Sequence, residues 1–510
     1  MYARLSLRPA DVSANIVFAP IHRFAAMLAL VLMAIFAFTP PLPNGDFVEY
    51  GVTTAAFARH ATPSLHYDDL DDAKRLSPPH AQYYDKLAQG IAAGEEIPLF
   101  GFNRSHQGRY FAIHPWGYSA LAAPAYVVLQ AVGLPPLKCF QFINLAMVFV
   151  LGLCAYRLFG SSWRAAVALV LFVLCGGALY WNWCSPECMS AAALLGSLIL
   201  FSTGAPLRAG LLAGLAAMQN PSIVFVAAFA PFLTAAVHHE AEGSWRRALA
   251  QCFTLRYAAA LAIIVVLFAM PFLFSQWQFG VPSLIKKYAT SPDFITWNRL
   301  HSLFLDLNQG MLVGVPALMA AVLLGGWRRR TGWITAVCVV MVLALVFPAL
   351  SARNWNSGAA GMMRYAFWAS MPLLFAMLMM LRRATRWPHA LVAAVVLVQA
   401  GAMWHAHLYD YVDMSPLARE VLERNPALYN PDPEIFSDRS SGGEVTPEKG
   451  KVYVFKNSAG VALKTMYHRE QADIGAVLCG PGRSLASTNR LTGADGGFVY
   501  ISGPVACAGQ

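Results

Sequence analysis

Two acidic side chains directly after the first apolar run could take part in proton transfer. Asp46 and Glu49 are three residues apart, so on a helix they share one face. A carboxylate at the membrane edge could act as general base on a substrate hydroxyl, and Tyr50 could contact the same substrate. An Asp before a helical run is also a common N-cap, and the local sequence favours that interpretation of Asp46.

Two basic side chains precede the second apolar run. Arg109 and His114 are hydrogen-bond donors at a predicted membrane surface, where they could bind a lipid-linked phosphate. They could equally be a snorkelling Arg and an interfacial His in an aromatic belt.

A later, Gly-containing loop carries Arg353 and Arg364 together with Trp355 and Tyr365. Arg residues are unexpected on the outer side of a membrane, so an anionic ligand is a better reason for them than anchoring. Trp355 and Tyr365 are candidate substrate contacts.

Segment 277–308 adds Lys286 and Lys287 as a weaker set of substrate contacts. The first loop is rich in His and Asp, which could bind a divalent metal ion or form a solvated acidic surface. No metal ligand is assigned. The His and Asp residues concerned are His60, His66, His80, His106, Asp68, Asp69, Asp71 and Asp72.

The elements that must position these residues are apolar helices. The chain is 57% hydrophobic and only 13% charged, against about 25% charged in a soluble domain. Runs of about 20 apolar residues are long enough to cross a bilayer, and about eleven are present. They lie near residues 22–40, 115–133, 138–158, 163–181, 185–203, 207–238, 255–276, 309–326, 332–351, 362–381 and 388–406.

The net charge of +10 does not indicate a nucleic-acid partner. Arg clusters at 246–247, 328–330 and 382–386 adjoin apolar runs, as expected of cytoplasmic loops, and no basic stripe with interleaved aromatics is present. With eleven crossings, loop 41–113 and the tail are extracytoplasmic. Arg157, Arg164 and Arg208 are then also outside, against the rule that basic residues concentrate on the cytoplasmic side. An alternative makes 115–133 re-entrant and splits 207–238 at Asn220-Pro221.

We therefore predict a mainly α fold with two parts. Residues 1–406 form a polytopic helical bundle with a long extracytoplasmic loop at 41–113, and residues 407–510 form a small mixed α/β extracytoplasmic domain. Segments 451–456 and 497–502 have strand character, and 415–425 has helix character. Cys479 and Cys507 are the two cysteines of the tail, and we expect a disulfide between them.

Residues 20–405 resemble the GT-C superfamily of integral-membrane glycosyltransferases, in the branch of protein mannosyltransferases and the aminoarabinose transferase of lipid A. Four features in order carry the resemblance. They are Asp46 after the first helix, the motif from His114 to Ser119 with Pro124, the motif from Asn308 to Leu312 with Pro316, and the loop from Trp355 to Tyr365. The chain departs from that family at Asn220-Pro221, where a basic residue is frequent, and in the spacing of Glu49 from Asp46.

The resemblance implies a multi-pass protein of the bacterial plasma (inner) membrane. It implies inverting transfer of a sugar from a polyprenyl-phosphate donor to an extracytoplasmic glycan, lipid or protein acceptor. Asp46 would be the base, with Glu49 beside it, and Arg109, His114, Arg353 and Arg364 would bind the donor phosphate. No nucleotide-binding motif is present, which agrees with a lipid-linked donor.

Two other functions fit a polytopic chain. A transporter or flippase of a polar lipid usually has ionisable residues within its helices and repeated halves. A glycan polymerase or ligase shares the topology, but its large outer loop commonly comes later in the chain.

Overall fold

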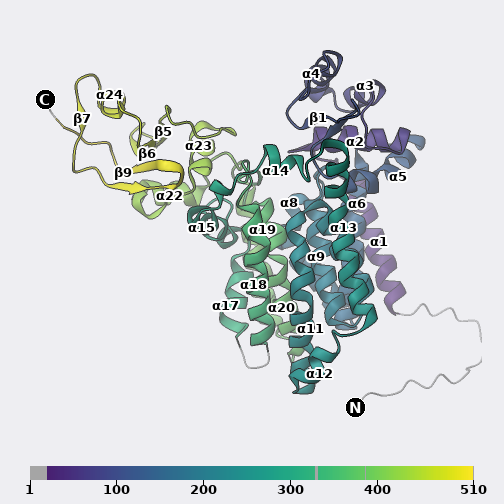
Figure 1. Cartoon of the computed structure of the whole chain (residues 1–510). Coiled ribbons are helices and arrows are strands. Elements are labelled where there is room, and N and C mark those ends of the chain that lie inside the picture. Colours follow the sequence, from purple (N-terminus) through teal and green to yellow (C-terminus); the bar gives the residue numbers. More distant parts are fainter. Residues whose placement is uncertain (1–19, 328–330, 385, 509–510) are drawn as a thin grey trace, which may run out of the picture.

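The computed structural model describes residues 20–327, 331–384 and 386–508. Long helices run side by side in a bundle, a helical layer covers one end of it, and a part with β-strands lies beside that end (Figure 1). The predicted Arg cluster at 328–330 lies outside the described residues.

In the described part of the chain, twelve helices make up the bundle. They are α1 (Pro20–Phe38), α6 (Lys138–Phe159), α7 (Ser162–Phe172), α8 (Ala178–Tyr180), α9 (Glu187–Ser202), α10 (Pro206–Gln219), α11 (Val226–Glu242), α13 (Leu255–Phe279), α17 (Pro316–Gly325), α18 (Gly332–Ala349), α20 (Met371–Arg383) and α21 (His389–Ala406). A π-helical turn, Val173–Gly177, joins α7 to α8, and the short α12 (Trp245–Ala250) follows α11.

Within the described residues, 8 helical stretches are long and apolar enough to cross a membrane by length and composition. They are α1, α6, α13, α18, α21 and the stretches Ser162–Tyr180, Pro221–Glu240 and Arg364–Arg383. Two shorter apolar helices are α9 and α17. These helices are consistent with a multi-pass membrane protein, as the composition predicts, whereas the predicted count of about eleven crossings stays a prediction.

Two segments differ from the simplest prediction. Segment 115–133 forms α5 (Gly117–Ala131), which packs on α2 across the end of the bundle and is not among the eight long apolar stretches. Segment 207–238 is broken into α10 and α11 by a 3-10 turn, Pro221–Phe225. Pro221 has no N–H for helix hydrogen bonding, which explains the break.

Small residues let the bundle helices approach closely. Every residue of α9 is buried. At Gly210 of α10 a Cβ would stand 2.4 Å from the Ala260 carbonyl oxygen of α13, and at Gly214 it would stand 2.6 Å from Leu267. Glycine is therefore needed at Gly210, where the close atom belongs to the backbone, whereas at Gly214 the close atom is the end of the flexible Leu267 side chain.

The helical layer contains the first loop. Its elements are α2 (Phe47–His60), α3 (Tyr67–Leu76), the 3-10 turn Pro78–His80, α4 (Ala81–Ala92), the hairpin of β1 (Phe102–Arg104) and β2 (Tyr110–Ala112), and α5. Tyr84 and Leu87 of α4, Phe102 of β1 and Val52 of α2 are fully buried and pack together inside this layer. The layer therefore has an apolar core of its own, which fixes α2 and the hairpin relative to each other.

Two later loops join this layer. One contains α14 (Leu284–Tyr288), the 3-10 turn Pro292–Phe294, α15 (Trp297–Leu305) and α16 (Met311–Gly314). The other contains β3 (Gly358–Ala359) and β4 (Met362–Met363) and leads into α19 (Arg364–Ala369), which begins the apolar stretch Arg364–Arg383.

The tail contains an antiparallel sheet of four strands in the order β5-β6-β9-β8. Strands β5 and β9 and helix α22 lie where the sequence predicts two strands and a helix. The tail elements are α22 (Pro416–Arg424), the 3-10 turn Pro426–Leu428, α23 (Pro433–Ser441), β5 (Tyr453–Lys456), β6 (Ala462–His468), α24 (Ile474–Cys479), β7 (Ser484–Leu485), β8 (Leu491–Gly493), the 3-10 turn Asp495–Gly497, β9 (Phe498–Ser502) and β10 (Cys507–Ala508). Cys479 and Cys507 form a disulfide.

A buried ion pair attaches the tail to the loop before α16. Both side chains, Asp306 and Arg439, are fully buried. Arg439 donates to the two carboxylate oxygens of Asp306 at 3.0 Å each, and the Tyr429 hydroxyl donates to the same carboxylate at 2.5 Å. Burial alone would raise the pKa of Asp306, but the guanidinium outweighs it and holds that pKa below its usual value.

We expect Asp306→Ala to destabilise the protein by about 3–5 kcal/mol, because it leaves the Arg439 guanidinium buried without its counter-ion. The thermal unfolding midpoint of the detergent-purified protein measures this. Asp293→Ala, at an exposed aspartate of the same loop, is the control and should change the midpoint little. The pair Asp306→Leu with Arg439→Met should recover most of the loss, and an unchanged midpoint for Asp306→Ala would contradict the role of the pair.

Candidate active site

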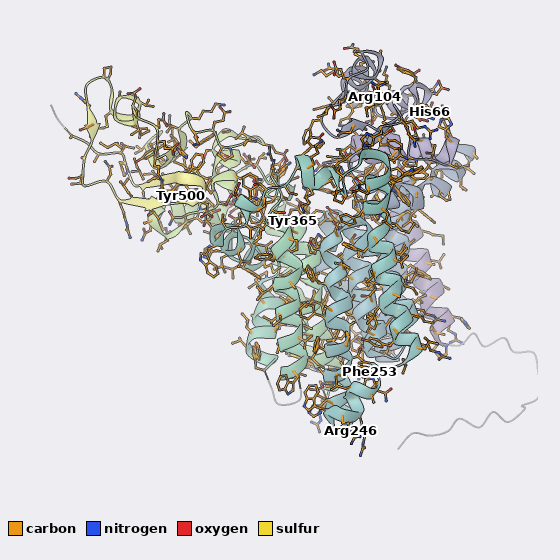
Figure 2. The ribbon with its side chains drawn as sticks, viewed as in Figure 1. His66, Arg104, Arg246, Phe253, Tyr365 and Tyr500 are labelled. Carbon is orange, nitrogen blue, oxygen red and sulfur yellow. A yellow bond between two sulfur atoms is a disulfide. The ribbon has the colours of Figure 1, made fainter. Side chains whose placement is uncertain are left out.

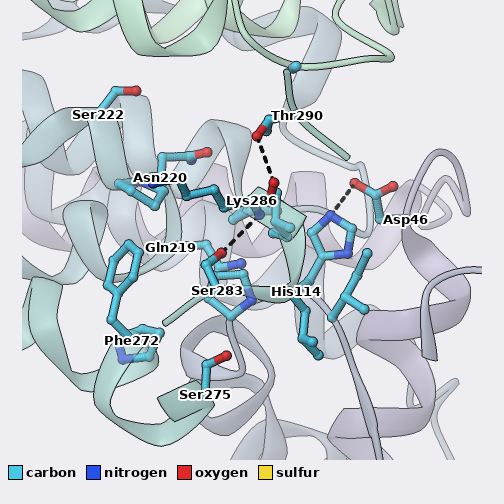
Figure 3. A pocket seen from close by; sticks show the side chains of 18 of the residues that line it. Asp46, His114, Gln219, Asn220, Ser222, Phe272, Ser275, Ser283, Lys286 and Thr290 are labelled. Carbon is cyan, nitrogen blue, oxygen red and sulfur yellow. Dashed lines mark hydrogen bonds and ion pairs between the residues drawn. The ribbon is translucent and has the colours of Figure 1, made fainter. Parts of the chain in front are cut away.

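Four charged side chains meet where the helical layer joins the bundle. Asp46 and Glu49 come from the start of α2, His114 from the segment before α5, and Arg364 from the start of α19. His114 lies between two carboxylates, with Nδ1 2.5 Å from Glu49 Oε2 and Nε2 3.3 Å from Asp46 Oδ2. Arg364 donates from Nη1 to the same Asp46 oxygen at 3.3 Å. Figure 3 shows the contact between Asp46 and His114. We call Glu49, His114, Asp46 and Arg364 the charge cluster; anions and cations alternate along it.

The backbone around α2 explains how two carboxylates reach one imidazole. The Asp46 carbonyl accepts from the N–H groups of Glu49 and Tyr50 and so begins the helix. The Asp46 side chain makes no capping hydrogen bond. Asp46 is therefore the N-cap residue of α2, as the local sequence favours, but its carboxylate does not cap the helix and contacts His114 and Arg364 instead. Glu49 lies one turn further along on the same face, as the spacing predicts.

The charge cluster shifts the ionisation of its members. Burial alone would lower the pKa of His114, but the Glu49 and Asp46 carboxylates outweigh it and raise that pKa to about 9. Burial would raise the pKa of Asp46, but His114 and Arg364 outweigh it and hold that pKa below its usual value. At neutral pH Asp46 is therefore a carboxylate and His114 an imidazolium. Burial raises the pKa of Glu49 although His114 opposes the shift.

The charge cluster lies at one side of a cavity of about 650 Å³, which we call the main cavity. Most of its wall is apolar and aromatic. The polar side chains of its lining include Asp46, Tyr50, His114, Glu187, Gln219, Asn220, Lys286, Arg364 and Tyr365. The aromatic ones include Phe111, Trp116, Phe272, Phe274, Phe279, Phe347 and Trp368. Such a cavity can hold a ligand that has both a charged group and a long apolar part.

Several polar residues of the main cavity were not predicted as site residues from the sequence, and Glu187, Gln219 and Asn220 are three of them. Glu187 begins α9 and is only 6% exposed, and its Oε2 has no hydrogen-bond partner among the residues that the structure describes. Gln219 donates to the Tyr50 hydroxyl at 3.0 Å, and Asn220 donates to Ser190 Oγ at 2.7 Å. An acid inside an apolar run is rare, so Glu187 could have been singled out on that ground.

Several predicted site residues lie elsewhere. Arg109 and Arg353 are exposed and do not line the main cavity. Arg109 lines a separate hollow beside His60 and His66. Trp355 is fully buried, 5.5 Å beneath the Arg299 guanidinium. Lys286 lines the main cavity, and Lys287 lines a neighbouring cleft.

Donor atoms that could hold a metal ion are also found at the charge cluster. Atoms of Asp46, Glu49 and His114 all lie within 4.8 Å of one another. In the first loop, His60 and His66 stack at 4.2 Å and His60 contacts Asp69, but this group does not meet the same geometry among the described residues. A metal at the charge cluster would need a neutral His114, which the two carboxylates disfavour.

The loop that carries Arg364 is held by the tail. Arg439 donates to Gln309 Oε1 at 2.8 Å, and Gln309 in turn donates to the Ala359 carbonyl at 3.0 Å and accepts from the Met363 N–H at 3.1 Å. Arg364 is the next residue. Hydrogen bonds therefore run from the buried Asp306–Arg439 pair to the residue before Arg364.

Helix α23 makes a second contact with the same loop. Glu434 accepts from the Asn356 N–H at 3.1 Å and from Arg299 at 2.6 Å. Asn356 also donates to Asp438 at 2.9 Å. The tail thus fixes the backbone on both sides of β3, and with it the start of α19.

Comparison of the chain with models of known protein families, with curated proteins and with solved structures found no match to any of them. The resemblance to GT-C glycosyltransferases therefore stays a prediction from the residues named above.

We expect the ion pairs of His114 to stabilise the protein only while the imidazole is charged. Its folded pKa is about 9, above the ordinary 6.5, so this contribution is complete below about pH 6.5 and is lost as pH rises through about 9. The thermal unfolding midpoint should fall over that range in the wild type but not in His114→Gln. In Glu49→Gln the fall should begin at lower pH.

The control for this measurement is His407→Gln, at an exposed histidine at the end of α21. It should keep the wild-type pH dependence. The same pH dependence in His114→Gln and in the wild type would contradict the charged imidazole. A midpoint raised by Zn²⁺ in the wild type and not in His114→Gln would favour a metal site instead.

Proposed function

We propose that the protein is a membrane glycosyltransferase of the GT-C type. It transfers a sugar from a polyprenyl-phosphate donor to an acceptor hydroxyl, with Asp46 as general base. The observation that carries the proposal is an ionised carboxylate paired with Arg364 at the side of a large apolar cavity. A lipid phosphate needs cations and its chain needs apolar walls, and the main cavity offers both.

The proposed reaction is a single displacement at the anomeric carbon. The acceptor oxygen forms the new glycosidic bond while the bond from that carbon to the phosphate oxygen breaks, so configuration inverts. The hydroxyl proton passes to Asp46, and the leaving lipid phosphate carries away the electron pair. Arg364, with Lys286 on the opposite loop, would stabilise the charge that grows on the phosphate.

The lowered pKa of Asp46 is compatible with this role. The acceptor hydroxyl becomes strongly acidic as its oxygen bonds to carbon, so a weak base can take the proton late in the step. His114 keeps Asp46 ionised and directed at the cavity, and Glu49 holds the imidazolium in place.

The proposal includes a membrane orientation with eleven crossings. The eight long stretches, the two shorter apolar helices and α10 add up to eleven, with α5 lying in the outer layer. The charge cluster would face the extracytoplasmic side. Arg246 then lies at the opposite, cytoplasmic end (Figure 2), where Arg157 donates to Thr203.

This orientation removes the wrong charge bias of the simplest prediction. Placing 115–133 outside and splitting 207–238 reverses the sides of the helices between them. Both changes belong to the alternative that the sequence left open. The positions that become cytoplasmic are Arg157, Arg164 and Arg208, whereas Arg246, Arg247 and Arg256 are cytoplasmic in both orientations.

One observation favours transport of a polar lipid as a second candidate function. Glu187 is a buried acid within an apolar helix, and such residues often mark transport pathways. Movement of a fluorescent polyprenyl phosphate across vesicles, without any change in surface glycans, would support that function over transfer.

We expect Asp46→Asn to reduce sugar transfer at least about a hundredfold, because the amide cannot take the acceptor proton. Mass spectrometry of surface glycans would compare cells that lack the gene with cells that express the wild type or the variant. Asp68→Asn, at an exposed aspartate of the same loop, should restore the glycan fully. Full restoration by Asp46→Asn, with the protein expressed at the wild-type level, would show that Asp46 is not the base.

A further inference from the structure

A second hollow adjoins the main cavity and differs from it in chemistry. It has a volume of about 470 Å³ and lies between the β1–β2 hairpin of the first loop and α14 of the second. We call it the polar cleft. Glu96, Asn103, Arg104, His106, Lys287 and Tyr288 line it. Figure 2 marks Arg104 in the helical layer, beyond the end of the bundle.

The polar cleft and the main cavity share a wall. Phe279 and Leu284 line both. The two consecutive lysines of α14 are divided between them, since Lys286 lines the main cavity and Lys287 the polar cleft. Neighbouring residues of a helix point about 100° apart, so one short helix supplies a cation to each hollow.

In the part of the chain that the structure describes, the two cations of the polar cleft are not in ion pairs, although the Tyr288 hydroxyl and, after it, the nearby Glu96 carboxylate help to raise the pKa of Lys287. Among the described residues, neither Arg104 nor Lys287 forms an ion pair. Arg104 makes one long hydrogen bond, 3.4 Å to the Gly94 carbonyl, and the Lys287 ammonium lies 4.7 Å from the Tyr288 ring centre. Glu96 is the acid in the lining. The polar cleft therefore carries excess positive charge that an anionic ligand could use.

The backbone of the polar cleft is fixed before any ligand arrives. The Arg104 N–H donates to the Glu96 carbonyl at 2.9 Å, and the His106 N–H donates to the Gln278 carbonyl at the end of α13 at 3.0 Å. The hairpin also contacts the charge cluster, because a Cβ at Gly101 would stand 2.5 Å from Glu49 Oε1. Gly101 also has φ +98°, a backbone conformation that residues with a side chain rarely adopt. Both the backbone conformation and the contact with Glu49 therefore exclude a side chain at this position.

We propose that the polar cleft binds the acceptor as an anionic sugar, one that carries a phosphate or a carboxylate. Arg104 and Lys287 pair with its charge, Asn103 and Glu96 bind hydroxyl groups, and the Tyr288 ring can lie against an apolar sugar face. This inference rests on the proposed function, in which the lipid-linked donor fills the main cavity. Because the two hollows share a wall, the water-soluble acceptor in the polar cleft would lie beside the lipid-linked donor in the main cavity.

The test measures binding without any transfer. The full-length protein in phosphatidylcholine nanodiscs is titrated with glucose 6-phosphate and with glucose, and binding is followed by saturation-transfer NMR. Inorganic phosphate has no carbon-bound protons, so its binding is measured by its displacement of glucose 6-phosphate. We expect glucose 6-phosphate to bind at least about tenfold more tightly than glucose or inorganic phosphate, because only it offers both charge and hydroxyls. Arg104→Gln and Lys287→Gln should each weaken it about tenfold.

Lys86→Gln removes the same charge from an exposed position of α4, outside the polar cleft, and should leave binding unchanged. Equal binding of inorganic phosphate and glucose 6-phosphate would overturn the proposal in favour of a simple anion site. Loss of sugar-phosphate binding when the nanodiscs also contain phosphatidylglycerol would assign the polar cleft to lipid headgroups and equally contradict it.

The result of the binding measurement can be interpreted separately from the proposed function. Asp46 does not line the polar cleft, so Asp46→Asn should bind glucose 6-phosphate as the wild type does even if it transfers no sugar. If the double variant Arg104→Gln with Lys287→Gln still binds glucose 6-phosphate, the polar cleft is not the acceptor site. The role of Asp46 as base would be unaffected. If Asp46→Asn leaves the surface glycans unchanged and glucose 6-phosphate still binds, the proposed function is contradicted, whereas the anionic-sugar site in the polar cleft is not.

Discussion

The ion pairs around Asp46 are the interaction on which the rest of the site depends. A carboxylate that is both partly buried and ionised needs positive charge close by, since burial favours the neutral acid. His114 and Arg364 supply that charge from two different loops, and Glu49 stabilises the imidazolium in turn. Removal of any one of these side chains would leave its neighbour in the charge cluster with an uncompensated charge. The helical layer and the α19 loop must therefore be held in register.

The outer parts of the protein achieve this by burial and hydrogen bonding. The first loop has its own apolar core around Tyr84 and Phe102, which fixes α2 against the hairpin. The tail is attached through Asp306 and Arg439, and Gln309 passes that attachment to the residue before Arg364. The tail, which has no counterpart in the resemblance, thus helps to position a member of the charge cluster. A buried ion pair adds little net stability, but it tolerates only one geometry, and that suits a positioning role.

Some of the site could be predicted from the sequence because the signal was local. Asp46 and Glu49 share a helix face by spacing, and His114 and Arg364 are charges beside apolar runs, where charge needs a reason. Arg109 and Arg353 have the same local signal, yet their side chains are exposed outside the main cavity. The side of a loop on which a side chain lies depends on the packing of that loop, which spacing does not reveal. Glu187 was not predicted, although an acid inside an apolar run is rare and is itself a local signal.

The amino-acid sequence by itself determined the apolar helices and the concentration of acidic residues in the first loop and tail, because these follow from residue chemistry within one turn or one span. It left the break at Pro221 open as an alternative, and the structure decided it. Tertiary structure decided which charges meet. It placed α5 against α2 and turned the Asp46 carboxylate from a cap into a partner of His114 and Arg364, which is 318 residues away. Such pairings arise from the packing of whole loops and helices, and no short stretch of sequence contains them.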